Sequence, residues 1–250
     1  MDNISISATI VTYNDGKKAL SAVKSIIENT KKYPLTLYVF DNGSSDETVS
    51  LINDNTSVKV FENGKNIGFG AAHNLVLKQE MGKYHFVINP DILVSDDVLS
   101  DMVDFMEENK DVVMCMPKIL NTDGTEQKLP KEKPTFKRLF LGRLSKSVRS
   151  EYIWQNKELS LPTEIDFCSG CFFCIRTDIF KKIGGFDKRF FMYLEDADLT
   201  QTAKSCGKVM ILPQFSVIHE WDRASAKSIK YLFIHTVSCL KFLFKRRKPI

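Results

Sequence analysis

Short apolar runs alternate with amphipathic segments through the first part of the chain. The apolar runs are rich in β-branched and aromatic residues, and each has the length of a buried strand. Strands are predicted over residues 4–11, 35–40, 58–61 and 86–88. Apolar residues at helical spacing predict helices over 16–30, 70–79 and 96–108, and Ser45 or Asp46 is expected to cap another. This alternation predicts an α/β fold with a mixed, mostly parallel central sheet flanked by helices.

The pattern becomes less regular after Pro117. The segment "NTDGTEQ" has the composition of a tight turn between strands. The basic stretch 128–149 predicts a loop or an irregular helix. A long strand is predicted over 165–176, and a short one over 209–212 that stops at Pro213.

Size and composition suit one globular domain. A chain of 250 residues, 43% of them hydrophobic, can bury one large core or two closely joined halves. We expect these halves to be residues 1–116 and 117–222, followed by a basic amphipathic tail at 223–250. A net charge of +4 is too small to indicate nucleic-acid binding. The start of the chain does not look like a signal peptide, and no apolar run reaches the roughly 20 residues of a spanning helix, so a cytoplasmic protein is expected.

Polar residues follow the predicted strands of the first half. They are Thr12-Tyr13-Asn14, Asp41, Asn66 in a turn, and Asn89-Pro90-Asp91. Ligands of largely parallel sheets bind at the carboxyl ends of the strands. We therefore expect these residues to gather along one edge of the sheet.

Asp91 is a candidate metal ligand. A carboxylate at a strand end, beside Asn89, suits a hard divalent cation such as Mg²⁺ or Mn²⁺. Such ions commonly take one or two carboxylates and complete their shells with phosphate oxygens and water. A turn or helix-capping role for Asp91 is the alternative.

The segment "YLEDADL" places acidic residues, including Glu195 and Asp196, at the start of a predicted helix. Acids at this position cap the helix and complement its dipole. The same position can keep a carboxylate ionised near neutral pH, ready to accept a proton as a general base. The two interpretations are compatible.

Two further patterns do not carry the chemistry they resemble. "GFGAAH" has His73 where a dinucleotide fingerprint needs its third glycine, and it follows the third strand instead of the first. Cys168, Cys171 and Cys174 lack the fourth cysteine of an iron–sulfur run. We interpret them as small buried residues of a packed strand, and six cysteines in all do not make a disulfide scaffold.

Taken together, the segments resemble family 2 glycosyltransferases, the inverting, nucleotide-sugar-dependent enzymes of the GT-A fold. Within that family they look like the rhamnosyltransferase-like members that build bacterial surface polysaccharides. The resemblance covers about residues 4–222. It rests on the order and spacing of "TIVTYND", "VFDNGSSDET", "NIGFGAAHN", "INPD", "CSGCFFCIR", "GGFDKRFFMYLEDADL" and "VIHE".

The resemblance implies a role for each matching position. The nucleotide would lie against Thr12, Tyr13, Asn14, Asp41, Asn66, Gly68, Gly70, Asn74 and Asn89. Asp91 and His219 would hold Mg²⁺ or Mn²⁺ at the diphosphate. The donor sugar and acceptor would be bordered by Cys168, Ser169 and Gly170. Asp196 would be the general base, supported by Glu195, in a single displacement that inverts the anomeric carbon.

The substrates stay open at this point. The subgroup favours dTDP-rhamnose, whereas the wider family favours a UDP-hexose of glucose, galactose or GlcNAc. The acceptor is expected to be a lipid-linked or oligosaccharide hydroxyl of a growing surface glycan. The family's metal motif is often Asp-x-Asp, and Asn89 replaces the first acid. A non-catalytic nucleotide-binding module is one rival, and a nucleotidyltransferase is another, although "TYNDGKK" is a poor triphosphate loop.

Apolar residues recur at helical spacing in the tail, and "KRRK" follows them. They are Ile229, Phe233, Val237, Leu240 and Phe244. A helix of this kind can lie on the inner face of the plasma membrane with its cations against anionic head groups, which would make the protein peripheral through residues 226–250. Packing on the domain or on a partner subunit is the alternative.

Overall fold

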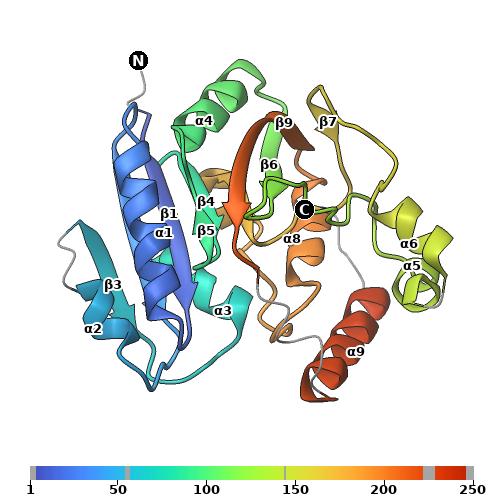
Figure 1. The fold of residues 1–250 in the computed structure, drawn as a ribbon, viewed down its shortest axis with the longest axis horizontal. Coiled ribbons are helices and arrows are strands. Elements are labelled where there is room, and N and C mark those ends of the chain that lie inside the picture. Colours follow the sequence, from blue (N-terminus) through green and yellow to red (C-terminus); the bar gives the residue numbers. More distant parts are fainter. Residues whose placement is uncertain (1–3, 54–56, 144, 222–228, 246–250) are drawn as a thin grey trace.

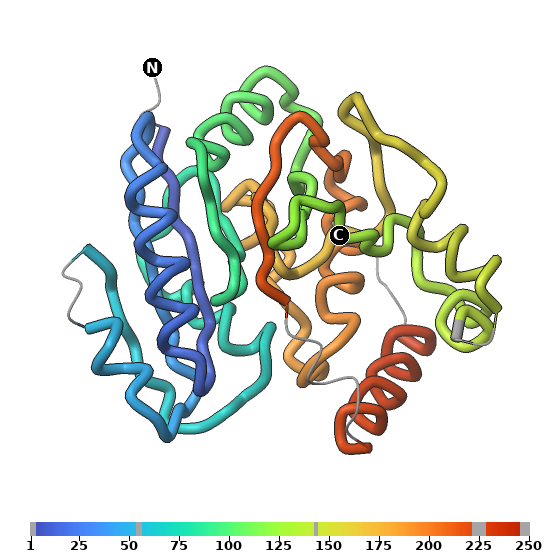
Figure 2. Tube along the Cα trace, viewed as in Figure 1, coloured from blue at the N-terminus to red at the C-terminus, as the bar shows by residue number. Residues whose placement is uncertain are grey.

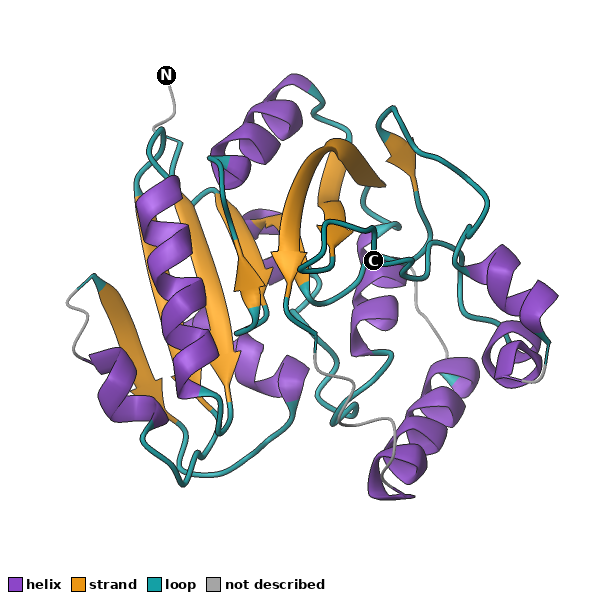
Figure 3. Cartoon of the chain, in the orientation of Figure 1, coloured by secondary structure: helices purple, strands orange, loops and turns teal. Residues whose placement is uncertain are grey.

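One mixed sheet organises the computed structural model, which describes residues 4–53, 57–143, 145–221 and 229–245 (Figure 1). Within these residues nine strands join in the order β3-β2-β1-β4-β8-β6-β9-β5, and β7 pairs with β9. Helices flank this sheet, as Figure 3 shows. The strands are β1 (Ile6–Thr12), β2 (Leu35–Asp41), β3 (Val58–Glu62), β4 (Tyr84–Ile88), β5 (Ile92–Leu93), β6 (Val112–Leu120), β7 (Thr163–Glu164), β8 (Phe172–Arg176) and β9 (Lys208–His219). The predicted fold class is confirmed.

The first strands form the parallel part of the sheet. β1 pairs in parallel with β2 and β4, and β2 pairs in parallel with β3. Every residue of β1 is buried, because helices and neighbouring strands cover both of its faces. The predicted strands of this half are confirmed to within about two residues. Their carboxyl ends lie at one edge of the sheet, where Thr12 pairs with Asp41.

The helices follow the predicted order with shorter bounds. They are α1 (Gly16–Asn29), α2 (Thr48–Asn53), α3 (Phe69–His73), α4 (Val98–Glu108), α5 (Phe136–Phe140), α6 (Lys146–Tyr152), α7 (Thr177–Lys182), α8 (Glu195–Ala203) and α9 (Ile229–Phe244). The helix predicted over 70–79 is α3 followed by a 3-10 turn, Asn74–Lys78. The basic stretch is α5, a 3-10 turn at Leu141–Arg143, and α6. It is therefore helical, but in short pieces.

The long strand predicted over 165–176 is wrong in its first part. β8 begins only at Phe172, where it enters the sheet antiparallel between β4 and β6. Of the preceding residues, Ile165 N still donates to Val209 O of β9 (2.9 Å), but Cys168 N donates to Thr200 Oγ1 (3.1 Å) and Gly170 N to Asp196 Oδ2 (3.0 Å), both on α8. These contacts turn the chain away from the sheet.

The prediction that a strand stops at Pro213 is also wrong. β9 continues to His219, pairing in parallel with β6 and antiparallel with β5. The register with β6 shifts between Leu212 and Ser216, and Pro213 lies within this irregularity. A proline cannot donate to a ladder, and a bulge removes the need for it to do so.

The core has two parts. The main cluster fills both faces of the sheet, and a second cluster joins α5, α8 and α9 through Leu139, Phe167, Phe190, Leu194, Ala197, Cys239 and Phe242. Figure 2 shows α9 beside the chain segment that leads into α8. Residues 226–228 and the "KRRK" basic residues 246–248 lie outside the described residues. In the part of the chain that is described, no helix is long and apolar enough to cross a membrane.

Candidate active site

The ends of β1 and β2 form a polar edge. Asn42 N donates to Thr12 O (2.8 Å), and Asp41 Oδ2 accepts from the backbone N–H groups of Gly43 (3.1 Å) and Ser44 (2.9 Å). Asn14 has a left-handed backbone (φ 53°), and its Oδ1 accepts from Ser45 N. Asp41 Oδ1 and Thr12 Oγ1 are buried without a hydrogen-bond partner in the described residues. Both oxygens are therefore available to a ligand that supplies N–H or O–H groups.

Tyr13 lies half-exposed between these residues. Its ring can cover a planar ligand at the same edge.

Asn42 is a site residue that the sequence interpretation missed. Its side chain is buried, its Nδ2 donates to Asn66 Oδ1 (3.1 Å), and its Oδ1 accepts from Ile67 N (3.0 Å). Asn66 Oδ1 also accepts from Gly68 N (3.0 Å). Asn42 thus holds the Asn66 loop beside the end of β2, and its position directly after Asp41 was the available signal.

Gly68 marks a close approach between two loops. Its φ is +89°, and a Cβ there would lie 2.3 Å from Phe191 O. The next residue, Phe69, donates its N–H to the same carbonyl (3.0 Å). Only glycine combines this backbone with this contact.

Gly70 and Asn74 face the protein interior. A Cβ on Gly70 would lie 2.7 Å from Phe186 Cβ. Asn74 Nδ2 donates to Phe186 O and Asn74 Oδ1 accepts from Phe186 N, both at 2.8 Å. The structure places these two residues against the segment 186–194, which we call the 186–194 loop. Both residues therefore support the 186–194 loop.

Asp91 and His219 meet at the end of β4. Asp91 Oδ1 lies 3.1 Å from His219 Nε2, and Asn89 Nδ2 lies 3.4 Å from the same nitrogen. The pairing of β5 with β9 brings them together, because it sets Ile92 opposite His219. The Asn-Pro-Asp turn after β4 thus faces the end of a strand far along the chain.

Gln127 fixes which nitrogen of His219 carries a hydrogen. Gln127 Nε2 donates to His219 O (2.9 Å), so Gln127 Oε1 is the atom that faces His219 Nδ1 at 3.0 Å. Since an amide oxygen only accepts, Nδ1 must donate. Gln127 is buried and is the last residue of the predicted turn segment, where no pattern pointed to a contact with His219.

In this arrangement the negative charge of Asp91 is not fully compensated by the described residues. Asp91 Oδ1 is buried and receives no hydrogen bond within the described residues. If His219 is neutral, its Nε2 presents a lone pair to that oxygen. Either a proton or a cation therefore belongs between Nε2 and Oδ1. An oxygen and an imidazole nitrogen suit Mn²⁺ well and Mg²⁺ less well, with phosphate and water to complete the shell. No group of three His, Cys, Asp or Glu ligands occurs among the described residues.

Asp196 lies at the first turn of α8, next to the turn before β8. Its Oδ2 accepts from Gly170 N (3.0 Å), and its Oδ1 accepts from Ala197 N (2.8 Å). A Cβ on Gly170 would lie 3.2 Å from Asp196 Cβ, so glycine allows this approach. The adjacent Cys171 O accepts from Asn89 N (2.8 Å). Residues 170–171 therefore connect Asp196 to the turn that carries Asp91.

Burial perturbs both acids of α8. It raises the pKa of Asp196 to about 6, although hydrogen bonds from the Gly170 and Ala197 N–H groups oppose the rise. Burial and the neighbouring charge of Asp196 raise the pKa of Glu195 to about 8. Burial therefore favours the protonated form of both acids, and the two titrate as a pair.

The backbone before these acids is strained. Tyr193 (φ 70°) and Leu194 (φ 64°) are both left-handed, and neither is glycine. Each such residue costs of order 1–3 kcal/mol and persists only where its surroundings impose it. The strain lies immediately before Glu195 and Asp196.

Cys168 and Ser169 flank Gly170 with different exposure. Cys168 is fully buried, and burial raises the pKa of its thiol well above the ordinary value. Ser169 is only partly buried, and its Oγ donates to Cys171 Sγ (3.4 Å). No disulfide joins cysteines within the described residues. The Cys168 side chain therefore packs in the protein interior, whereas the Ser169 side chain lies nearer the surface.

Two adjoining cavities lie beside the acids of α8 and beside the neighbours of His219. The smaller, of 260 Å³, is lined by Glu195 and Asp196, and the larger, of 610 Å³, by Gln127 and Trp221. Trp221 stacks on His219, with ring centroids 6.4 Å apart and planes at 6°. The residues that line both cavities are Pro130, Leu139, Tyr152 and His235. The cavities thus extend from the acids of α8 toward the Asp91–His219 pair.

Comparison with known proteins gives a consistent result. The model of glycosyl transferase family 2 matches residues 7–184. The N-acetylglucosaminyl-diphospho-decaprenol L-rhamnosyltransferase of Mycobacterium tuberculosis is 25% identical over 94% of this chain and 83% of its own. Rhamnosyltransferase WbbL of Escherichia coli is 26% identical over 72% of this chain and 71% of its own.

Solved structures share the fold. GalNAc-T7, crystallised with UDP, GalNAc and Mn²⁺, superposes with a TM-score of 0.66 at 19% identity; the match covers 88% of this chain and 44% of that one. Mannosyltransferase PcManGT from Pyrobaculum calidifontis, in complex with GDP-Man and Mn²⁺, gives a TM-score of 0.67 at 15% identity, covering 99% and 66%. This chain therefore spans less than half of the first structure and about two thirds of the second. The GT-A architecture expected from the sequence is confirmed.

Proposed function

Since this chain belongs to glycosyl transferase family 2, we propose that it transfers rhamnose or another hexose from a nucleotide-diphosphate donor to a hydroxyl of a growing surface glycan, with inversion. The observation that carries the proposal is the link through residues 170–171. Gly170 N binds Asp196, and Cys171 O binds the backbone of the Asn89–Asp91 turn. A base and a diphosphate-binding residue are thereby set on one side of the sheet.

In this proposal the two halves of the domain have different functions. Residues 1–116 bind the nucleotide through Thr12, Tyr13, Asn14 and Asp41, with the loop held by Asn42 closing one side. Residues 117–222 provide the acceptor side and the base. The unpaired oxygens of Thr12 and Asp41 support the first part, because a nucleoside carries the donors that they lack.

Asp91 and His219 are the residues that would hold Mg²⁺ or Mn²⁺. The buried, unbonded Asp91 Oδ1 and the Nε2 lone pair facing it fit such an ion. When bound, the ion supplies positive charge to the departing diphosphate. The Mn²⁺ in the GalNAc-T7 and PcManGT structures supports this assignment.

Asp196 is the proposed general base. Its carboxylate takes the proton of the acceptor hydroxyl while that oxygen bonds to the anomeric carbon and the bond from that carbon to the diphosphate oxygen breaks. Attack opposite the leaving group inverts the centre. Glu195 supports this role because burial and the charge of Asp196 raise its pKa, which favours its protonated form and limits repulsion of the Asp196 carboxylate.

The relatives guide the choice of substrates. Two rhamnosyltransferases among them support dTDP-rhamnose as donor. A UDP-hexose is the alternative, supported by the UDP in the GalNAc-T7 structure. The printed name of the M. tuberculosis relative contains N-acetylglucosaminyl-diphospho-decaprenol, which supports a lipid-linked acceptor over a free oligosaccharide.

A lipid-linked acceptor agrees with the outer face of α9. Apolar side chains are exposed along it, namely Ile229, Leu232, Phe233, Leu240 and Phe244. No acidic residue lies within α9. We place the protein peripherally on the inner face of the plasma membrane. Sedimentation with vesicles containing anionic lipid tests this: Phe233→Ser with Phe244→Ser should halve the bound fraction or more, and unchanged binding would contradict it.

A donor panel tests the proposed activity. Thermal shifts with dTDP-rhamnose, UDP-glucose, UDP-galactose and UDP-GlcNAc, with and without Mn²⁺, should show one donor that raises the melting temperature only when metal is present. Transfer to a lipid-diphosphate acceptor is then followed, and the anomeric configuration of the product is read by NMR. Retention of configuration would overturn the mechanism. Donor binding without transfer to any acceptor would favour a non-catalytic module.

A further inference from the structure

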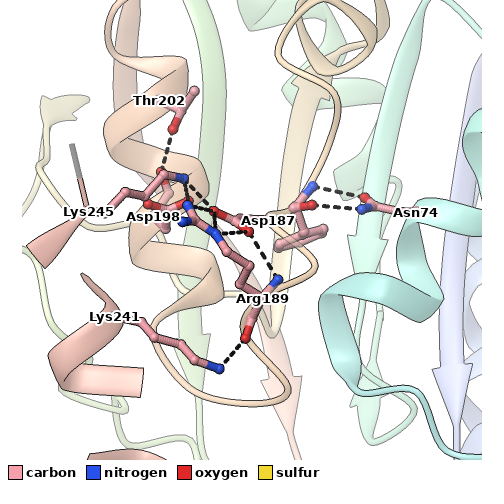
Figure 4. Close-up of polar contacts among 8 residues, drawn as sticks. Asn74, Asp187, Arg189, Asp198, Thr202, Lys241 and Lys245 are labelled. Atoms are coloured by element: carbon pink, nitrogen blue, oxygen red, sulfur yellow. Dashed lines mark hydrogen bonds and ion pairs between the residues drawn. The ribbon is translucent and has the colours of Figure 1, made fainter. Parts of the chain in front are cut away.

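A charged cluster lies between α9 and the segment that carries the acids (Figure 4). Lys245 Nζ lies 2.8 Å from Asp187 Oδ2 and 2.6 Å from Asp198 Oδ2. The Lys245 side chain is 17% exposed and that of Asp198 only 2%. One ammonium at the end of the described tail is thus shared by two carboxylates away from bulk water.

These carboxylates belong to two different parts of the site. Asp187 lies at the start of the 186–194 loop, and Asp198 lies on α8, two residues after Asp196. Lys245 therefore joins the start of the loop to α8, the helix that follows the loop. Arg189 also binds Asp187, with Nη2 2.6 Å from Oδ2. Arg189 first, and Lys245 after it, hold the pKa of Asp187 well below its usual range, so Asp187 stays ionised at working pH.

Helix α9 holds the same loop at further points. Ser238 Oγ donates to Met192 O (2.7 Å), and Lys241 Nζ donates to Arg189 O. Cys239 and Phe242 pack in one cluster with Phe190 and Leu194. On the donor side, Asn74 binds Phe186 through both of its amide atoms, and Phe69 N binds Phe191 O. The loop is thus fixed between the donor side and α9.

Such support is what the strained backbone of the loop requires. Tyr193 and Leu194 are left-handed directly before Glu195, and this conformation persists only if neighbouring contacts impose it. Several of the contacts around these residues come from α9. The orientation of the first turn of α8, and with it Asp196, therefore depends on the tail.

We propose that Lys245 is a positioning residue for sugar transfer. By joining Asp187 to Asp198 it fixes the 186–194 loop, and the loop holds the Asp196 carboxylate where an acceptor hydroxyl arrives. The proposal rests on the proposed function, in which Asp196 is the base. It makes α9 a part of the active site as well as a candidate membrane anchor.

Steady-state kinetics on three variants test this. Lys245→Met should lower kcat by about 10–100-fold, because a misplacement of about 1 Å costs that much in rate, while the KM for the donor stays within about twofold. Lys245→Arg keeps the charge and should recover kcat to within about threefold of wild type. Lys188→Met is the matched control: it removes an exposed cation beside Asp187 and should leave both constants unchanged. Wild-type kcat in Lys245→Met, or a parallel loss of donor affinity, overturns the proposal.

Hydrogen exchange provides a readout that does not need activity. Amides of residues 190–198 should exchange at least tenfold faster in Lys245→Met than in wild type or Lys188→Met, and those of β1 and β2 should not change. If Lys245→Met does not fold, Ser238→Ala replaces it, with a smaller loss of kcat and the same local exchange expected. Unchanged exchange refutes the loop contact whatever the activity. Absence of transfer by wild type, with the exchange difference present, refutes the proposed function alone.

Discussion

The proposed donor side, at the ends of β1 and β2, and the proposed base side, around Asp196 on α8, are held in different ways. At the donor side, Asp41 is bonded to Gly43 and Ser44, a few residues along the same chain, and Asn14 and Asn42 reach adjacent loops. At the base side, Asp196 is bonded to Gly170, and its helix is tied to Lys245. The first set follows from ordered parallel strands, whereas the second depends on distant segments.

This difference shows where the molecule carries strain. The donor edge includes one left-handed residue other than glycine, Asn14, and asparagine tolerates that conformation. The base side places Tyr193 and Leu194 in the same region, directly before the buried Glu195 and the partly buried Asp196. The base side therefore gives up stability to hold carboxyl groups whose pKa values burial raises. Substitutions on the base side should therefore mainly lower kcat, whereas substitutions on the donor side should mainly raise the KM for the donor.

The strongest test of the base side is Asp196→Asn. We expect kcat to fall about 10³-fold, because general-base catalysis typically contributes 10²–10⁴. Donor affinity, measured by calorimetry, should stay within about threefold. Asp178→Asn, an exposed change on α7, serves as control. Transfer at the wild-type rate would remove Asp196 from the mechanism.

The contact between the two sides is tested by Gln127→Leu. Without the Gln127 carbonyl, His219 Nδ1 loses its acceptor and Nε2 is no longer held toward Asp91. Loss of such a supporting bond typically lowers metal affinity by about 10–100-fold. Mn²⁺ binding followed by electron paramagnetic resonance measures this, with the exposed Gln155→Leu as control. Equal affinity in the two variants would argue against His219 as a ligand.

The cost of burying Glu195 and Asp196 should appear in the pH dependence of the free energy of unfolding. Folding raises the pKa of Glu195 to about 8 and of Asp196 to about 6, so between about pH 4 and 8 the folded state binds more protons than the unfolded one. The free energy of unfolding should therefore fall as pH rises through this window. Glu195→Gln should make this decrease smaller and should raise the free energy of unfolding by about 1–3 kcal/mol at pH 8. Urea denaturation at several pH values checks this, and parallel curves for the two proteins would refute it.

The smallest expected effect is at the donor side. Asn42→Ala removes two hydrogen bonds to the Asn66 loop and should lower the free energy of unfolding by about 1–2 kcal/mol. The KM for the donor should rise about threefold to tenfold with kcat nearly unchanged. Asn156→Ala, on an exposed loop, is the control. A fall in kcat instead of a rise in KM would mean that this loop serves the base side too.

The same contrast explains what the sequence could predict. Thr12, Asp41 and Asp91 follow apolar runs, so strand periodicity placed them at one edge. Gly170 and Lys245 could not be placed in this way, because their partners Asp196 and Asp187 are distant in the chain. The first part of the strand predicted over 165–176 is absent for the same reason. Its sequence favours a strand, but the backbone N–H groups of Cys168 and Gly170 are hydrogen-bonded to side chains of α8. Gln127 was missed because its partner, His219, lies at the end of a strand predicted to stop at Pro213.

The bulge around Pro213 has a consequence for how this chain can change. His219 lies six residues beyond Pro213, on the same strand, and successive side chains of a strand point to opposite faces. Removing one residue, such as Gln214, would reset the alternation and turn the imidazole away from Asp91. Substitution of the exposed Gln214 should be tolerated, whereas its deletion should leave a folded protein in which His219 no longer faces Asp91.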